Sequence, residues 1–364
     1  MANTTSPMTS SPITNNPTTI QHTNTSVPTT ITPLHPYVPW SVLIEPGTYF
    51  LLLCVLLIIQ YGSWRCRSVA STSNGAMEGT ENINWIMVVL IPVMLSLLLV
   101  VLFYALSSLW ILIFIVVGIV SIGSVVLVTW PLYGFVAMYI NRLFKSSVIE
   151  DYGGLSLSVL TAVGLGIAWI VTGHWIVLDI LATATIITIL TYIRIPTLSL
   201  GITLLCVMLV YDVVWTFLSP ILFGESVMEH VAKQVAGGWV TLPIVIAVPH
   251  IWSNGASILG LGDVLVPGLF IVFLLRWDGH NRHMPWEGTA RCGYLGYVLG
   301  YLLTFFILVV SDRGQPALLY IVPCVLTASL GYSYIKTELN ELRNYSTENS
   351  IMDLPDASEA TNIL

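Results

Sequence analysis

The chain has 364 residues, of which 55% are hydrophobic and only 9% are charged, with a mean hydropathy of +0.85. Soluble domains carry about 25% charged residues, so this composition excludes an ordinary globular enzyme and a disordered chain. The 12 lysines and arginines are scattered, which excludes the basic patch of a nucleic-acid-binding protein. What remains is a polytopic membrane protein. More than half of the net charge of −7 comes from the C-terminal tail, so the total indicates no cationic partner.

The first 42 residues form a low-complexity segment rich in Thr, Ser, Asn and Pro. Such a segment cannot bury enough apolar surface to offset the entropy lost on ordering, so we predict a disordered lumenal tail. It has neither the basic nor the apolar region of a signal peptide. Asn3 and Asn24 begin glycosylation sequons, and the Thr/Ser/Pro content suits O-glycans. A tail without glycans is the alternative.

Nine apolar runs, each long enough to cross a bilayer, follow this tail. They lie at about 43–61, 85–105, 108–130, 155–173, 175–194, 198–218, 256–275, 293–311 and 316–335. We therefore predict an all-α membrane protein with helices 1–5 in 43–195, helices 6–9 in 196–336 and an acidic cytosolic tail over 337–364. With a lumenal or extracellular N-terminus, ten of the 12 Lys and Arg residues face the cytosol, as the positive-inside rule expects.

Nearly all ionisable residues fall in loops; the exceptions are Asp179, Asp212, Asp263 and, at the edge of the first span, Glu45. A carboxylate at mid-bilayer costs about 2.5 to 3.5 kcal/mol on insertion, so a function is the default hypothesis. If the sixth span ends near residue 220 and the seventh begins near residue 255, Asp212 and Asp263 both lie about 12 Å below the lumenal boundary and can face each other. Asp179 lies nearer the interface, and we interpret it as a structural hydrogen-bonding residue.

Two facing carboxylates in a low dielectric do not both ionise easily, so one keeps a proton and the two titrate as a pair. Aspartic proteases use this state: the ionised acid takes a proton from water, and the protonated acid polarises the scissile carbonyl. No metal or cofactor is needed. A structural pair of buried, hydrogen-bonded acids, or a proton- or cation-coupled transporter, would carry similar acids. The equal depth of Asp212 and Asp263 does not distinguish these two alternatives from a protease.

Other features have simpler interpretations. The five cysteines are far apart and form no CxxC pair, so we expect buried free thiols. The two histidines within 280–283 lack a third ligand nearby, so we expect no metal site. Gly293, Gly296 and Gly300 repeat at small-residue spacing along the eighth predicted span, which predicts close packing against a neighbouring helix.

Three short motifs surround the acids. They are Tyr211-Asp212 on the sixth span, Gly260-Leu261-Gly262-Asp263 on the seventh, and Gln315-Pro316-Ala317-Leu318 at the start of the ninth. The glycines remove side-chain bulk beside Asp263, which lets another backbone approach or loosens the start of the helix. Pro316 fits the first turn of a helix, where its missing N–H costs little.

In this order, on the sixth, seventh and ninth of nine spans, the motifs resemble those of the GxGD intramembrane aspartyl proteases, the presenilin and signal peptide peptidase group. The match is to the signal peptide peptidase-like branch that usually carries a protease-associated domain. The resemblance is clear over about 150–336. It implies a catalytic pair, Asp212 and Asp263, with active-site support from Tyr211, Gly260, Leu261 and Gly262 and substrate positioning by Gln315, Pro316, Ala317 and Leu318.

The resemblance also implies a cofactor-free endopeptidase that hydrolyses peptide bonds within the transmembrane segments of type II single-pass membrane proteins. It implies a multi-pass protein of endosomes or lysosomes, the Golgi or the plasma membrane. We expect no protease-associated domain, because the Thr-rich tail stands where that branch carries it. The partners implied are these substrates and the lipid bilayer, with no nucleic acid; a homo-oligomer is left open. A catalytically silent binding homologue and a transporter that uses the same aspartates remain alternatives.

Overall fold

The structure is a computed structural model, and it describes residues 44–72, 81–144, 147–224, 227, 242–252, 255–281, 288–311 and 315–347. The predicted tail with Asn3 and Asn24, and the end of the acidic tail, lie outside the described residues. Nearly all of the described chain is helical, and its short strands form two separate pairs without a closed sheet. The predicted class, an all-α membrane protein, is therefore confirmed.

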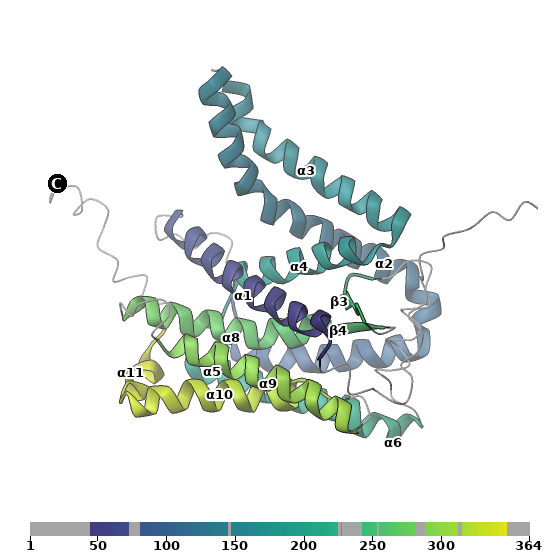
Figure 1. Cartoon of the computed structure of the whole chain (residues 1–364), viewed down its shortest axis with the longest axis vertical. Helices are drawn as coiled ribbons and strands as arrows, with labels where there is room; N and C mark the ends of the chain where they lie inside the picture. Colours follow the sequence, from purple (N-terminus) through teal and green to yellow (C-terminus); the bar gives the residue numbers. More distant parts are fainter. Residues whose placement is uncertain are drawn as a thin grey trace, which may run out of the picture. The chain divides into compact units, whose positions relative to one another are not determined.

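Figure 1 shows how the helices and strands follow one another along the chain, and it labels most of them. The helices are α1 (Pro46–Thr72), α2 (Trp85–Phe144), α3 (Ser147–Thr172), α4 (Trp175–Tyr192), α5 (Leu198–Val213), the π-helical η2 (Val214–Leu218), α6 (Ser219–Phe223), α8 (Leu261–His280), α9 (Thr289–Ser311), α10 (Leu318–Ile335) and α11 (Leu339–Asn344). The strands are β1 (Glu81–Asn82), β2 (Ile193–Arg194), β3 (Val245–Pro249) and β4 (Ala256–Gly260). β1 pairs with β2 in parallel, and β3 pairs with β4 in antiparallel.

By length and composition, eight described helical stretches can cross a membrane. They are Pro46–Cys66, Trp85–Ala105, Ser108–Val136, Gly154–Thr172, Trp175–Tyr192, Leu198–Phe223, Thr289–Ser311 and Leu318–Ile335. Helix α8 is 20 residues long but carries four ionisable residues, Asp263, Arg276, Asp278 and His280. The chain is thus a multi-pass membrane protein, and the count of nine spans and their orientation stay predictions.

The second and third predicted spans lie in one continuous helix, α2, rather than in two helices. It has 60 residues, and a straight helix of that length would measure about 90 Å. Figure 1 shows that its ribbon bends instead of running straight. Pro92 and Pro131 interrupt its hydrogen-bond ladder, because neither has an N–H to donate.

The sixth predicted span, 198–218, is longer than expected and irregular. The apolar helix runs on through η2 and α6. Pro220 has no N–H to donate to the carbonyl of Thr216, four residues earlier, so the regular ladder cannot continue there. The pattern shifts to i→i+5 bonds, in which the N–H of Ser219 donates to the carbonyl of Val214. This π-helical turn begins two residues after Asp212, and such turns recur at functional sites.

The seventh predicted span, 256–275, begins too early, because residues 256–260 form strand β4 and helix α8 starts at Leu261. Asp263 therefore lies in the first turn of α8 and not eight residues into a helix. The equal helical depth predicted for Asp212 and Asp263 is therefore wrong, because strand β4 replaces the helical turns expected before Asp263. Asp263 nevertheless lies near Asp212, because α8 packs directly against α5.

Helix α8 lies at the centre of the larger hydrophobic core. It packs against α1, α4, α5, α9 and α10, and its residues 266–275 are all buried. A second cluster forms where α2, α3 and α4 meet, with the ring of Trp169 stacked on that of Phe114 at 4.7 Å between centroids. The central position of α8 fixes the start of that helix, and with it Asp263, relative to its neighbours.

Two smaller sequence predictions have different outcomes. A Cβ atom on Gly296 would lie 2.5 Å from the carbonyl oxygen of Cys324, and one on Gly300 would lie 2.5 Å from the Cα of Ile321. The close helix packing predicted from the glycine spacing is therefore confirmed for α9 against α10. All five cysteines are free, as expected, but only Cys66 is buried. Cys54, Cys292 and Cys324 are half-buried and Cys206 is exposed, so the expectation of buried thiols is confirmed for Cys66 alone.

Candidate active site

Asp212 lies near the end of α5 and is only 8% exposed. Its Oδ2 accepts the backbone N–H of Leu318, the first residue of α10, at 3.2 Å. The first N–H groups of a helix have no partner within the helix, and they form its positive end. Asp212 therefore satisfies one of these donors, and this bond joins the motif of the sixth span to that of the ninth.

Asp263 is half-buried, and its carboxylate interacts with the backbone N–H of Gly260 and with the charge of Asp212. A Cβ atom at position 260 would lie 3.3 Å from Oδ2 of Asp263, so an alanine there would press on the carboxylate. Gly262 is exposed, and a Cβ atom built there would have no neighbour within 4 Å. The carboxylate of Asp263 is therefore held by the backbone at Gly260, and the chain next to it is exposed at Gly262.

Tyr297 of α9 is a residue of this site that the sequence reasoning missed. Its hydroxyl donates to the backbone carbonyl of Asp263 at 3.4 Å, and its side chain is fully buried. In a regular helix that carbonyl would accept the N–H four residues on, but this residue is Pro267, which has none. The hydroxyl of Tyr297 supplies the missing donor and ties α9 to the first turn of α8.

Strands β3 and β4 form a second feature that the sequence did not reveal, a hairpin that leads directly into Asp263. On the outer edge of β3, the N–H of Ala247 donates to Oδ1 of Asp179 at 2.9 Å, which confirms the structural role expected for Asp179. At the turn, Oε1 of the fully buried Glu45 accepts the N–H groups of Ile251 and, at 3.0 Å, Trp252. Two acids of α4 and of the segment before α1 therefore hold the hairpin in place.

Side-chain bonds fix the hairpin further. The hydroxyl of Ser257 in β4 lies 2.8 Å from that of Thr48 in α1 and 3.1 Å from Nε2 of His250. The hydroxyl of Tyr301 donates to the Thr48 carbonyl at 3.1 Å, which brings α9 into the same network. Burial lowers the pKa of His250, and the nearby Glu45 carboxylate opposes that shift. The network keeps the hairpin, and hence the approach to Asp263, in one position.

The other predicted site residues are spread around the two acids. Tyr211 is half-buried beside Asp212, and Leu261 donates its N–H to the Ile244 carbonyl at 3.3 Å, which anchors the start of α8. Gln315 accepts a bond from the hydroxyl of Tyr320 at 3.3 Å. The stretch of Gln315, Pro316 and Ala317 lies before α10, which begins at Leu318, so Pro316 is not in the first turn as predicted.

The family model described as Signal peptide peptidase matches residues 75–349. The chain belongs to the signal peptide peptidase family. It is 35% identical over 279 residues to Signal peptide peptidase-like 2 of Arabidopsis thaliana, covering 72% of this chain and 50% of that protein. It is 34% identical over 224 residues to Signal peptide peptidase-like 3 of the same plant, covering 59% and 42%. With the human Signal peptide peptidase-like 2A it shares 33% over 202 residues, covering 52% and 37%.

The chain thus spans half or less of the length of these relatives, and the family resemblance read from the motifs is confirmed. The signal peptide peptidase family comprises intramembrane proteases of the aspartyl type, so the family implies membrane-protein substrates within a lipid bilayer. Among the described residues, no group of three His, Cys, Asp or Glu side chains is arranged to hold a metal ion. The arrangement at Asp212 and Asp263 is two interacting carboxylates, each of which accepts one backbone N–H, that of Leu318 and that of Gly260 respectively. Such a pair can act as general acid and general base.

Proposed function

We propose that the chain is an intramembrane aspartyl endopeptidase that cleaves within the transmembrane segments of type II single-pass membrane proteins. In this proposal, Asp212 and Asp263 are the catalytic pair. The observation that carries it is the meeting of the two acids, from α5 and α8, with the N–H of Leu318 bonded to one of them. Membership of the signal peptide peptidase family supports the reaction class.

The chemistry needs one proton shared by the two acids. The ionised carboxylate takes a proton from a water molecule, whose oxygen forms a bond to the scissile carbonyl carbon. The protonated acid donates a hydrogen bond to the carbonyl oxygen and stabilises the tetrahedral intermediate. The amide nitrogen then receives a proton as the C–N bond breaks, which leaves one acid protonated and one ionised for the next turnover.

The substrate has to be extended at the cut, because a helix hides its carbonyl carbons inside its own hydrogen-bond ladder. Strand β4 offers a place for such a segment. Its register with β3 points the N–H groups of Ser257 and Leu259 toward β3 and that of Ile258 away from it. An extended segment that pairs with this outer edge would run beside Asp263, with main-chain bonds giving affinity for many sequences.

The proposal is tested by cleavage of a tagged type II reporter with purified protein in detergent. Asp212→Asn and Asp263→Asn each keep the size of the side chain and remove the acid, so each abolishes the fragment that the unchanged protein produces. The matched control is Asp179→Asn, because an asparagine oxygen still accepts the N–H of Ala247. This control keeps activity.

The outcomes separate the alternatives. A fragment that persists in both variants of the pair would refute the catalytic assignment. No cleavage by a folded, unchanged protein, across a panel of type II reporters, would favour a silent binding homologue. Ion- or pH-coupled flux that either substitution abolishes, with no cleavage, would favour a transporter.

A further inference from the structure

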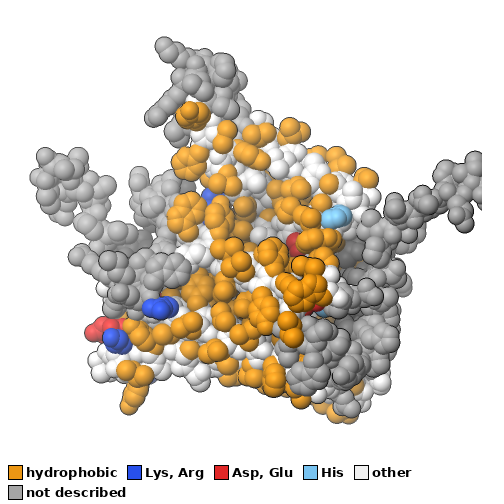
Figure 2. Space-filling model, viewed as in Figure 1, with side chains coloured by type: hydrophobic (Ala, Val, Ile, Leu, Met, Phe, Trp, Pro, Cys, Tyr) orange, Lys and Arg blue, Asp and Glu red, His pale blue; other side chains and the backbone are white. Residues whose placement is uncertain are grey.

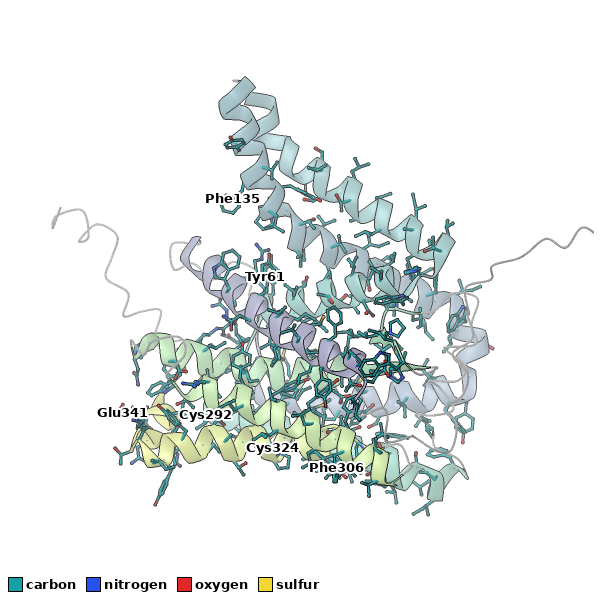
Figure 3. All side chains as sticks on the ribbon, viewed as in Figure 1. Tyr61, Phe135, Cys292, Phe306, Cys324 and Glu341 are labelled. Atoms are coloured by element: carbon teal, nitrogen blue, oxygen red, sulfur yellow. The ribbon has the colours of Figure 1, made fainter. Side chains whose placement is uncertain are left out.

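A cavity of about 440 Å³ opens between the ends of α9 and α10 that lie away from the acid pair. It is lined by Gly288, Arg291, Cys292, Leu295, Tyr332, Lys336 and Glu338. These residues belong to the end of the bundle that the charge bias assigns to the cytosol. Figure 3 shows Cys292 at the end of α9 that lies toward α11.

The cavity exists because α9 and α10 are in contact near the middle of α9 and lie further apart toward its first residues. At Gly296 and Gly300 the backbones of α9 and α10 are in contact, so no side chain fits between them. About two turns nearer the end, the hydroxyls of Thr289 and Ser333 lie 3.1 Å apart in the buried interior and close the inner side. The outer side stays open. Thr337, with a φ of +60°, turns the chain so that the residues on both sides of it line the opening.

The lining combines positive charge with an apolar wall. Among the residues that line the cavity, the two cations Arg291 and Lys336 outnumber the single acid, Glu338. A second carboxylate, that of Asp278, lies beside Gly288 and accepts the backbone N–H groups of Thr289 and Ala290. The ammonium of Lys336 lies 5.9 Å from the centroid of the Tyr332 ring. In Figure 2, blue and red side chains gather at the end that α11 occupies in Figure 1, beside a hydrophobic surface.

The apolar wall continues onto the surface that faces lipid. Leu295 lines the cavity and is 53% exposed, and Leu299, one turn further along α9, is 60% exposed. A ligand with an anionic head and an apolar chain would fit both the basic residues and the apolar wall. A free anion would contact only the basic residues, so the apolar wall favours a lipid as the occupant.

We propose that this cavity binds an anionic phospholipid of the cytosolic leaflet. Its phosphate lies between Arg291 and Lys336, and one acyl chain follows Leu295 and Leu299. Basic pockets between transmembrane helices on the cytoplasmic side recognise anionic headgroups in this way. The site is separate from the acid pair, so the proposal stands whether or not Asp212 and Asp263 are catalytic.

The test is native mass spectrometry of the full chain in detergent, with phosphatidylserine compared with phosphatidylcholine of the same acyl chains. The unchanged protein retains phosphatidylserine in preference. Arg291→Gln and Lys336→Gln each lower that retention about fivefold, as expected for the loss of one basic contact to an anionic headgroup. Arg343→Gln is the matched control, because this exposed arginine on α11 lies at the same end but does not line the cavity. Equal retention in all four proteins would overturn the proposal.

Two further measurements keep the proposal testable if a charge variant does not fold. Leu295→Trp fills the apolar wall without changing charge and lowers phosphatidylserine retention. In the unchanged protein, phosphatidylserine slows alkylation of Cys292 but not of the exposed Cys206, whereas phosphatidylcholine slows neither. Unchanged retention in Leu295→Trp, or equal alkylation of Cys292 in both lipids, contradicts the proposal. Protection of Cys292 by inorganic phosphate alone, equal to that by phosphatidylserine, would show a free-anion site instead and would also contradict it.

Discussion

The bond between Tyr297 and the backbone of Asp263 gives the sharpest prediction about how the site is held. The Asp263 carbonyl lies partly buried at the start of α8, and Pro267 leaves it without the usual helical donor. Tyr297→Phe removes only the hydroxyl and leaves that carbonyl without this partner. The first turn of α8, and the carboxylate it carries, then lose their link to α9.

The size of the effect follows from the geometry. An intramolecular hydrogen bond contributes about 0.5 to 1.5 kcal/mol, and a buried group left unpaired costs about 1 to 3 kcal/mol. An O–H···O distance of 3.4 Å is long, so the low end applies. We expect Tyr297→Phe to lower the free energy of unfolding by about 1 kcal/mol. We also expect a lower rate of reporter cleavage, because Asp263 is less firmly positioned.

A double-mutant cycle isolates this bond. Pro267→Ala restores an N–H that can donate to the Asp263 carbonyl, so Tyr297→Phe has little further effect in that background. The matched control is Tyr301→Phe. Tyr301 is buried to the same degree, but the carbonyl it bonds, that of Thr48, also has a helical donor within α1.

Both quantities are measurable on purified protein in detergent, by unfolding and by reporter cleavage. The reasoning predicts a coupling free energy of about 1 kcal/mol between positions 297 and 267. It is refuted if Tyr297→Phe has the same effect with and without Pro267, or if Tyr301→Phe is equally damaging.

Three further changes test other parts of the structure. Ile258→Pro removes an N–H on the outer edge of β4 without breaking a bond to β3, so it lowers cleavage while Ile258→Ala does not, measured with the same reporter. Gly300→Ala places a Cβ atom 2.5 Å from the backbone of α10 and destabilises the protein by several kcal/mol. The control is Gly331→Ala: position 331 has open space around it, so this change leaves the unfolding midpoint unchanged or raises it. Asp278→Ala leaves two N–H groups at the start of α9 without their carboxylate acceptor. We expect the free energy of unfolding to fall by about 3 kcal/mol, and a fall of less than about 1 kcal/mol would contradict this role.

Hydropathy and short motifs predicted much of this molecule because the bilayer imposes simple rules. Apolar runs of about 20 residues have to be helices, since every backbone polar group in lipid needs an internal partner. The three motifs marked the residues that the fold brings together, and the contact of Leu318 with Asp212 joins two of them. Glycine spacing at Gly296 and Gly300 predicted the contact of α9 with α10.

The start of α8 was mispredicted because the run over 256–260 is apolar and suits either a strand or a helix. Residues 256–260 form a strand because they pair with residues 245–249, which hydropathy places in a loop. The role of Tyr297 also depends on a distant partner. Tyr294, Tyr297 and Tyr301 lie three and four residues apart along α9, a pattern that places their hydroxyls on one face. That pattern was visible in the sequence, but their acceptors were not.

The central claim is that Asp212 and Asp263 together direct water at a peptide bond inside a transmembrane segment. The most direct measurement is mass spectrometry of the reporter fragments after cleavage in water labelled with oxygen-18. The account predicts a cut within the membrane segment, with labelled oxygen in the new carboxylate, and no such fragment from Asp212→Asn or Asp263→Asn. A fragment that both variants still produce, or a cut outside the membrane segment, would contradict it.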